Sequence, residues 1–284
     1  MSTKLILSRM RRSIFFMTGL VLFIIVMAFV YVLPPFLKYD PVATSLTERF
    51  IAPEWFANGF NSHVFGTDYL GRDVLARLVI GGHYSFSLGF TVVILVTTVG
   101  CVLGTVSGYF GGWADMIIMR FCEAMMAIPT MIMAIAMIAV LGQSTRNLII
   151  IMVIGGWVQL CKLTRNNVRI VKSQEFVLAS KALGAKGPHI MFRQIFPNVT
   201  TQIIVLTSQR VAGVIMMEAG LSYLGLGIPL PAPTWGNMIS EGRVYLMSQS
   251  WLVFIPGIAL MMTVLAFNFL GDGLRDVLDT RRKA

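Results

Sequence analysis

Charged residues are scarce in this 284-residue chain. They make up 13% of its composition, whereas hydrophobic residues make up 56% and the mean hydropathy is +0.76. Because soluble domains carry about 25% charged residues, this composition disfavours one large soluble domain. The sequence also lacks the G-x-x-x-x-G-K-[ST] pattern of a nucleotide-binding loop, any serine–histidine–aspartate or cysteine–histidine arrangement, and a carboxylate pair of hydrolase character. We therefore expect no catalysis by this chain alone.

Residues that bind metals are few and scattered. The three cysteines lie at positions 101, 122 and 161 without C-x-x-C spacing, and the three histidines are far apart. We therefore expect no disulfide framework, no metal site and no cofactor. The net charge of +10 does not indicate nucleic acid, because the basic residues are not gathered on a soluble domain with interleaved aromatic residues.

Long uncharged runs are abundant instead. A helix needs about 20 apolar residues to cross a bilayer, and six segments approach this requirement: 13–33, 84–114, 116–141, 147–163, 199–226 and 244–270. The sequence therefore predicts an all-α, multi-pass protein with six transmembrane helices in a lipid bilayer. The first run is too long for a signal peptide and no A-x-A cleavage site follows it, so we interpret it as an uncleaved anchor.

The basic residues predict the orientation in the membrane. Six spans place both ends of the chain on one side. Fifteen of the 23 lysines and arginines lie near the amino end, between the fourth and fifth spans, or in the carboxyl tail. Since positive loops stay inside, both termini are predicted to be cytoplasmic. We divide the chain into residues 1–83, an anchor span and an extracytoplasmic loop with an interfacial helix, and residues 84–284, a five-span core with a cytoplasmic loop over 164–197.

That cytoplasmic loop contains several glycines and prolines that can begin or end short helices. Residues 175–183 favour a helix that Gly184 can stop in a left-handed conformation. Pro188 suits the start of a second short helix, which Pro197 is expected to end. The small residues around Ala179 would allow another surface to approach closely. An ordinary interfacial amphipathic loop is the alternative.

Several motifs in this chain resemble those of one transporter family. Leu178-Ala179-Ser180, Gly184 and Ile195-Phe196-Pro197 resemble the EAA loop of ABC-importer permeases, with departures at Leu178, where the pattern has Glu, and at Ser180, where it has Ala. Four further stretches resemble the C-type subunit of the dipeptide/oligopeptide/nickel permeases: 63–74, 218–227, 233–238 and 266–276. The resemblance covers nearly the whole chain from about residue 8.

This resemblance implies a fold, a set of partners and a role for the cytoplasmic loop. The fold would be that of a type I ABC importer permease in the cytoplasmic (inner) membrane. The partners would be a second homologous permease, two cytoplasmic ATPase subunits and an extracytoplasmic substrate-binding protein. The cargo would be di- or oligopeptides, with nickel or glutathione as alternatives. The coupling loop would contact the ATPase through Glu175, Ala179, Ser180, Lys181, Gly184 and Pro197.

The outer loop offers a second candidate surface. Thr67 and Asp68 can cap a helix that begins near Gly71 and lies on the membrane surface. Its residues would either orient the second span or form a docking surface for the binding protein, and the residues expected there are Asp68, Arg72, Asp73 and Trp235.

Charges inside the spans are the last candidates. Such charges are costly in lipid and should face protein or water. Arg120 and Glu123 are expected to pair locally near the inner surface. Arg210 and Glu218 are candidates for the translocation path. They are eight residues apart and roughly on one helical face, so they could pair with each other or with the partner subunit. An ion-gradient-driven transporter would predict inverted repeats and discontinuous spans. A membrane scaffold without transport would leave the punctuated loop unexplained.

Overall fold

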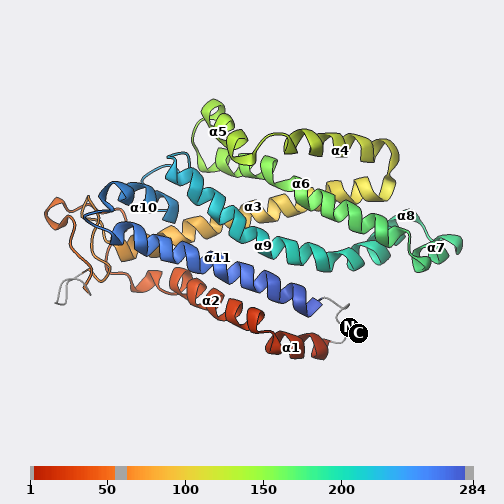
Figure 1. Ribbon diagram of the computed structural model, residues 1–284, viewed down its shortest axis with the longest axis horizontal. Coiled ribbons are helices and arrows are strands. Elements are labelled where there is room, and N and C mark those ends of the chain that lie inside the picture. The colour runs from red at the N-terminus through yellow and green to blue at the C-terminus, as the bar shows by residue number, and fades with distance from the viewer. Residues whose placement is uncertain (1–2, 55–62, 279–284) are drawn as a thin grey trace.

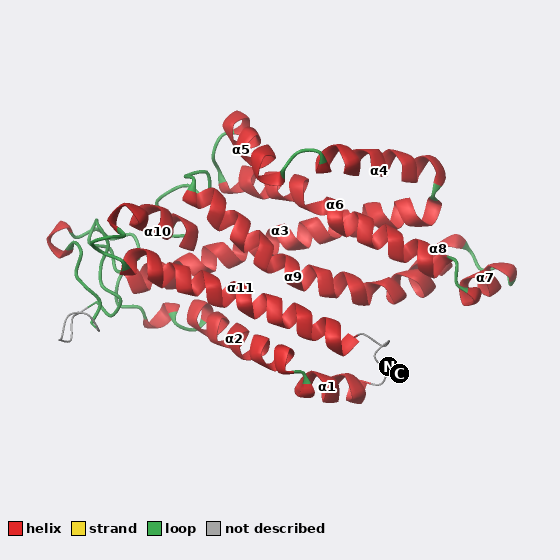
Figure 2. Ribbon diagram, in the orientation of Figure 1, coloured by secondary structure: helices red, strands yellow, loops and turns green. Residues whose placement is uncertain are grey.

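The computed structural model describes residues 3–54 and 63–278, with side chains from residue 8 onward. The basic residues at positions 281–283 that entered the charge count lie outside these ranges. Within the described ranges the regular secondary structure is helical and no β-strand forms, which confirms the all-α prediction (Figure 2). The long helices lie side by side, and α1 (Thr3–Arg12) and the last turns of α11 (Trp251–Leu278) lie at the same end of the molecule as α7 (Glu175–Ala182) and α8 (Gly187–His189) (Figure 1).

Among the described residues, five helices are long and apolar enough to cross a membrane, and a bent pair of helices supplies a sixth apolar segment. The five are α2 (Ile14–Tyr31), α3 (Val74–Phe110), α6 (Thr145–Lys172), a helix over Gly187–Tyr223 that includes α9 (Phe196–Tyr223), and α11 (Trp251–Leu278). We call the end with α1 (Thr3–Arg12), α7 (Glu175–Ala182) and α8 (Gly187–His189) the inner end, following the predicted orientation. The opposite, outer end holds η1 (Pro34–Phe36), η2 (Leu46–Glu48), α10 (Trp235–Gly242) and η4 (Arg243–Tyr245).

The second span differs from the prediction. The prediction of a separate interfacial helix before residue 84 was wrong. α3 runs unbroken from Val74 to Phe110 and crosses the domain boundary that was predicted after residue 83. Asp73, rather than Thr67 or Asp68, caps it by accepting a hydrogen bond from the Ala76 amide. The glycines at 81 and 82 do not break this helix, and they bring it close to the Pro233 carbonyl and the Trp235 ring.

The third span is not one straight helix. α4 (Gly112–Met126) and α5 (Thr130–Leu141) meet at an angle of 86° across residues 127–129. Pro129 occupies the cap of α5, and proline disfavours helical geometry in the residue before it. The prediction of a continuous span over 116–141 therefore needs this correction. Arg120 and Glu123 pair at 3.0 Å, as predicted.

The cytoplasmic loop is shorter than predicted, because α6 continues to Lys172. α7 ends as expected: Gly184 has φ +87°, and the Ala185 amide donates to the Ser180 carbonyl, closing the helix end. Pro197 does not end a second helix. A π-helical stretch, Ile190–Ile195, leads directly into α9, and the Phe196 amide donates to the Met191 carbonyl. This wider register suits a proline one residue later, which has no N–H to donate.

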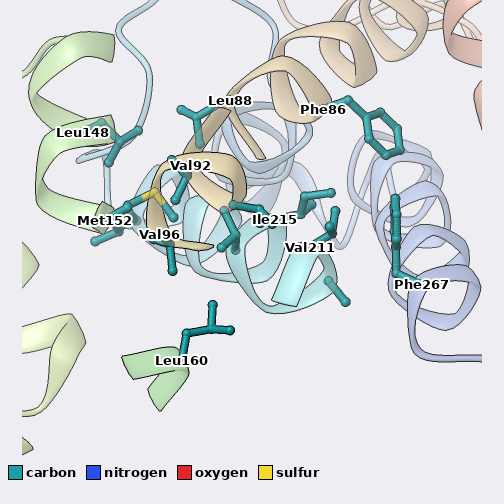
Figure 3. Close-up of a cluster of buried hydrophobic side chains, with 14 of the residues drawn as sticks. Phe86, Leu88, Val92, Val96, Leu148, Met152, Leu160, Val211, Ile215 and Phe267 are labelled. Atoms are coloured by element: carbon teal, nitrogen blue, oxygen red, sulfur yellow. The ribbon is translucent and has the colours of Figure 1, made fainter. Parts of the chain in front are cut away.

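The core is built on α3. Its side chains meet α6, α9 and α11 in a cluster that Figure 3 draws: Phe86, Leu88, Val92, Val96, Leu148, Met152, Leu160, Val211, Ile215 and Phe267. Gly100, Gly104 and Gly108 form a stripe with four-residue spacing along α3. A Cβ added at Gly104 would lie 2.5 Å from the Cys161 carbonyl oxygen of α6. Small residues at this spacing let two membrane helices approach closely, so α3 and α6 form one tightly packed unit.

Candidate functional site

A cleft of about 510 Å³ lies in the middle of the membrane-spanning region. It is bounded by the bend between α4 and α5, by α6 and by α9. Gly155 of α6 allows the bend to approach, since a Cβ there would lie 2.6 Å from Thr130 Cγ2. Most of the lining is apolar, and three residues bring long polar side chains: Gln159, Gln209 and Arg210.

Arg210 is the charged residue of this cleft. Its Nη2 atom donates a hydrogen bond to Gln159 Oε1 at 2.8 Å. The bond holds the guanidinium between α9 and α6, beside open space. A fixed cation there can meet carbonyl or carboxylate oxygens of a polar solute. The role of Arg210 in a translocation path stays a prediction. The sequence did not indicate its hydrogen-bond partner, Gln159.

Glu218 lies elsewhere, and this separates two residues that the sequence grouped together. Its side chain is fully buried and absent from the cleft lining. It accepts hydrogen bonds from Ser222 Oγ at 2.6 Å and Ser85 Oγ at 3.4 Å. Eight residues turn an α-helix by about 80° beyond two full turns, so Arg210 and Glu218 leave α9 in different directions. The possible pairing between them was therefore wrong, and Glu218 binds α3 to α9 instead.

The inner end presents α7. Val177 is buried and anchors the helix, while Gln194 Nε2 donates to Ser180 Oγ at 2.6 Å. The predicted contact residues Glu175, Ala179, Lys181, Gly184 and Pro197 are exposed, and Ser180 is half-buried. Three large apolar side chains are also exposed on this short element, namely Phe176, Leu178 and Leu183, the last at 90%. Exposed apolar groups on an otherwise polar segment mark an interaction surface.

The outer end is held together by a cluster of buried charges, which we call the outer charge cluster: Asp68, Arg72, Arg77 and Glu241. Arg72 contacts Asp68 at 2.7 Å and Glu241 at 3.1 Å. Arg77 contacts the same two carboxylates at 3.1 and 2.5 Å. The cluster thereby joins the first outer loop and α3 to α10.

Two ionisable groups of the loop that precedes α3, Tyr69 and Arg72, show shifted pKa values. Burial lowers the pKa of Arg72, but the carboxylates of Asp68 and Glu241 outweigh it, so the pKa is raised. Burial raises the pKa of Tyr69, and the nearby Glu241 carboxylate, which accepts a hydrogen bond from the Tyr69 hydroxyl at 3.2 Å, raises it further. Both shifts favour the protonated forms, the charged Arg72 guanidinium and the neutral Tyr69 hydroxyl, which donate to carboxylates of the cluster.

The expected docking residues are inside the chain. Asp68, Arg72, Asp73 and Trp235 expose 6%, 4%, 5% and 1% of their surfaces. Asp73 caps α3 and contacts His63 Nδ1 at 2.8 Å, and Trp235 Nε1 donates to the Leu78 carbonyl at 2.8 Å. Their assignment to direct docking is therefore corrected, and the other reading of this region, a structural elbow, fits these contacts. Glu241 was not predicted from the sequence, although it is the one acidic residue between positions 227 and 250. Its loop and the loop that carries Arg72 are predicted on the same side of the membrane, which was the available signal.

Comparisons with known proteins extend this picture. Residues 100–284 match the family described as binding-protein-dependent transport system inner membrane component. The oligopeptide transport system permease protein of Bacillus subtilis is 37% identical and is aligned over 96% of this chain and 88% of its own length. The dipeptide transport system permease protein of Haemophilus influenzae is 36% identical, over 92% of this chain and 89% of its own. A glutathione transport system permease protein of Pectobacterium atrosepticum is 37% identical, over 79% of this chain and 74% of its own.

Two solved structures share the fold at low sequence identity. A chain of the MetNI methionine ABC transporter in inward-facing conformations has a TM-score of 0.58 and 16% identity, and the match covers 72% of this chain and 97% of that one. A chain of an amino acid ABC transporter has a TM-score of 0.55 and 12% identity, with 69% and 91% covered. These likenesses confirm the predicted ABC importer permease fold.

Proposed function

The chain belongs to the family of binding-protein-dependent transport system inner membrane components and is a permease subunit of an ABC importer, and we propose that it imports di- and oligopeptides. The observation that carries the substrate class is the match to two peptide permeases along more than nine tenths of this chain. The glutathione permease among the relatives supports a second candidate, since glutathione is itself a short peptide.

We place the translocation path in the cleft beside Arg210. A peptide offers backbone carbonyls and a terminal carboxylate, which a guanidinium binds with charge-assisted hydrogen bonds. The cleft is lined mainly by apolar residues, with Gln159 and Gln209 as further polar partners for a peptide backbone. Glu218 has no part in this proposal, because its side chain is enclosed between α3 and α9.

A second, homologous permease completes the path in this proposal. The bent pair α4–α5 carries large apolar side chains that this chain leaves exposed: Met116, Ile117, Phe121, Met131, Ile132 and Val140. A permease of the same fold would cover these side chains and supply the opposite wall, as a heterodimer.

Two cytoplasmic ATPases drive transport through α7. ATP binding would draw the ATPases together, and α7, held between them and the spans, would carry that movement into the membrane. Glu175, Ala179, Lys181 and Gly184 form its exposed surface, together with Leu178 and Leu183. Ser180 and Pro197 belong to its supports. This orientation puts α7 and both termini in the cytoplasm and the chain in the cytoplasmic (inner) membrane.

An extracytoplasmic binding protein delivers the substrate at the outer end. Its contacts are the exposed groups above the outer charge cluster, among them Leu46, Val244 and Met247. The ring contact between Phe50 and Tyr245, at 5.0 Å, joins the two loops that carry them. Asp68, Arg72, Asp73 and Trp235 hold this surface in shape from below.

The experiment compares Gly184→Val with Gly142→Val. Both glycines have positive φ, of 87° and 78°, and open space around the missing side chain. Each substitution therefore places a β-branched residue at positive φ, and only Gly184 lies in the segment that carries α7. We expect Gly184→Val to lose ATPase copurification and uptake of labelled dipeptide while the protein still inserts, and Gly142→Val to keep both.

The parent complex identifies the cargo in the same assay. Uptake of dipeptide, glutathione or nickel is measured separately with each candidate binding protein. Parental uptake by Gly184→Val would contradict the role of α7. Uptake that persists without ATP would instead favour a gradient-driven transporter.

A further inference from the structure

Tyr109 touches both flanks of the segment that carries α7. This tyrosine is the penultimate residue of α3. Lys172, the last residue of α6 before that segment, donates from Nζ to the Tyr109 carbonyl at 2.5 Å and lies 5.2 Å from the ring centre. The Tyr109 hydroxyl donates to the carbonyl of Gly187, where the chain becomes helical again, at 3.1 Å. One residue of α3 thus holds the entry and the exit of the α7 segment.

The contact at Gly187 is closely fitted. A Cβ added at Gly187 would lie 3.1 Å from the Tyr109 hydroxyl oxygen. The Tyr109 ring is partly buried and packs against the main hydrophobic core. A displacement of Gly187 therefore meets a side chain that cannot move without moving the end of α3.

The end of α3 is in turn fastened to the start of α4. Gly111 and Gly112 form the turn between them, with φ of 68° and 52°. Asp115, in the first turn of α4, accepts a hydrogen bond from Ser107 of α3 at 2.5 Å and forms an ion pair with Arg165 of α6, whose Nη2 lies 2.6 Å from Oδ2. At its other end α4 reaches the bend, where Met125 and Met126 line the cleft.

We propose that Tyr109 is a positioning residue that transmits the displacement of α7 to α4 and so to the cleft wall. The chain connects α7 directly to α6 and α9, and the Asp115–Arg165 ion pair links α6 to α4. Tyr109 adds a second link, by joining Lys172 and Gly187 to the α3–α4 turn. This inference rests on the proposed function, in which an ATPase moves α7. Loss of the hydroxyl leaves the ATPase contact intact and weakens only the transfer of movement.

The test uses the complete complex of permeases, ATPases and binding protein in proteoliposomes. It measures labelled dipeptide imported and ATP hydrolysed in the same vesicles. Tyr109→Phe keeps the ring and removes one hydrogen bond, whose net worth corresponds to a factor of about 3 to 10 in an equilibrium. We expect the number of peptides imported per ATP to fall by about this factor, while stimulated ATP hydrolysis continues.

Two further variants sharpen the result. Lys172→Met keeps most of the side-chain length and removes the donor to the Tyr109 carbonyl, so we expect the same direction of change. Phe110→Leu alters the exposed neighbouring ring, which is 67% accessible, and is expected to leave the ratio unchanged.

An unchanged ratio in Tyr109→Phe would overturn the inference about Tyr109 alone. A proportional fall of import and hydrolysis together with a lower melting temperature would also overturn it, because the hydroxyl would then only support the fold. Failure of the proposed function looks different. In that case the parent complex imports no peptide, or Gly184→Val behaves like the parent.

Discussion

Glu241 is the residue on which the outer charge cluster depends most. Its carboxylate contacts Arg72, Arg77 and the Tyr69 hydroxyl, at 3.1, 2.5 and 3.2 Å. The side chain of Arg77 is 2% exposed and that of Glu241 14%, so water has little access to the Arg77 guanidinium when this partner is lost. In Glu241→Gln the two guanidinium groups would share Asp68 alone. Removing one partner of a buried ion pair costs about 3–5 kcal/mol.

The assay is thermal unfolding in detergent at a fixed scan rate, because membrane proteins of this kind often unfold irreversibly. A change of 1 kcal/mol shifts the melting temperature by about 2–4 °C in chains of about this size. We therefore expect Glu241→Gln to lower it by about 6–20 °C. Glu48→Gln is the matched control: this carboxylate is 47% exposed and lies 3.8 Å from His63. Because Glu48 itself is exposed to water, its contact contributes about 0–1 kcal/mol, so we expect a fall of less than about 4 °C.

Equal shifts in the two variants would refute the reasoning. Such a result would mean that the two arginines keep their stabilisation from Asp68 and from solvent. The outer charge cluster would then be a surface feature, and the burial of its members would carry no energetic weight.

Two other substitutions test the packing of α3 and the titration of Tyr69. In Gly104→Ala the new Cβ would lie 2.5 Å from a carbonyl oxygen and 2.7 Å from the Thr164 Cβ, so α3 and α6 must separate, at a cost of about 1–3 kcal/mol and a lower melting temperature. Gly213→Ala, with nothing within 4 Å, should instead gain up to about 1 kcal/mol from helix propensity. The raised folded-state pKa of Tyr69 means that its stabilisation is fully present below its unfolded pKa of about 10 and is lost as the pH rises through the higher folded value. Between about pH 9 and pH 11 the melting temperature of Tyr69→Phe should therefore fall less than that of the parent. An equal fall in both proteins would contradict the raised pKa of Tyr69.

Much of the helical layout follows from local sequence. Uncharged runs predicted the six apolar segments, and Gly184 ends α7 in the left-handed conformation that its position indicated. These features depend on a few neighbouring residues. The unbroken start of α3 depends on packing between distant segments, such as Gly81 against the Pro233 carbonyl. The bend at Pro129 has a local cause, which the prediction of a continuous span over 116–141 did not include.

The site residues were harder to predict for the same reason. Charged side chains in an outer loop look like a surface in the sequence, and nothing local reveals that Arg77 and Glu241 meet across 164 positions. Helical spacing suggested that Arg210 and Glu218 share a face, but the serines at 85 and 222 hold Glu218 in the interior. The exposed residues of α7 could be identified in advance because a single short segment carries them all.

The distance along the chain between the members of the outer charge cluster has a consequence for biogenesis. Arg72 and Arg77 leave the ribosome 169 and 164 residues before Glu241. Synthesis proceeds from the amino end, so in the proposed orientation these arginines cross the membrane before α10 is synthesised. The outer face can therefore close only when nearly all of the chain has been inserted. A chain truncated before α10 would keep two arginines that share one carboxylate, a defect by which quality control could distinguish it from the complete protein.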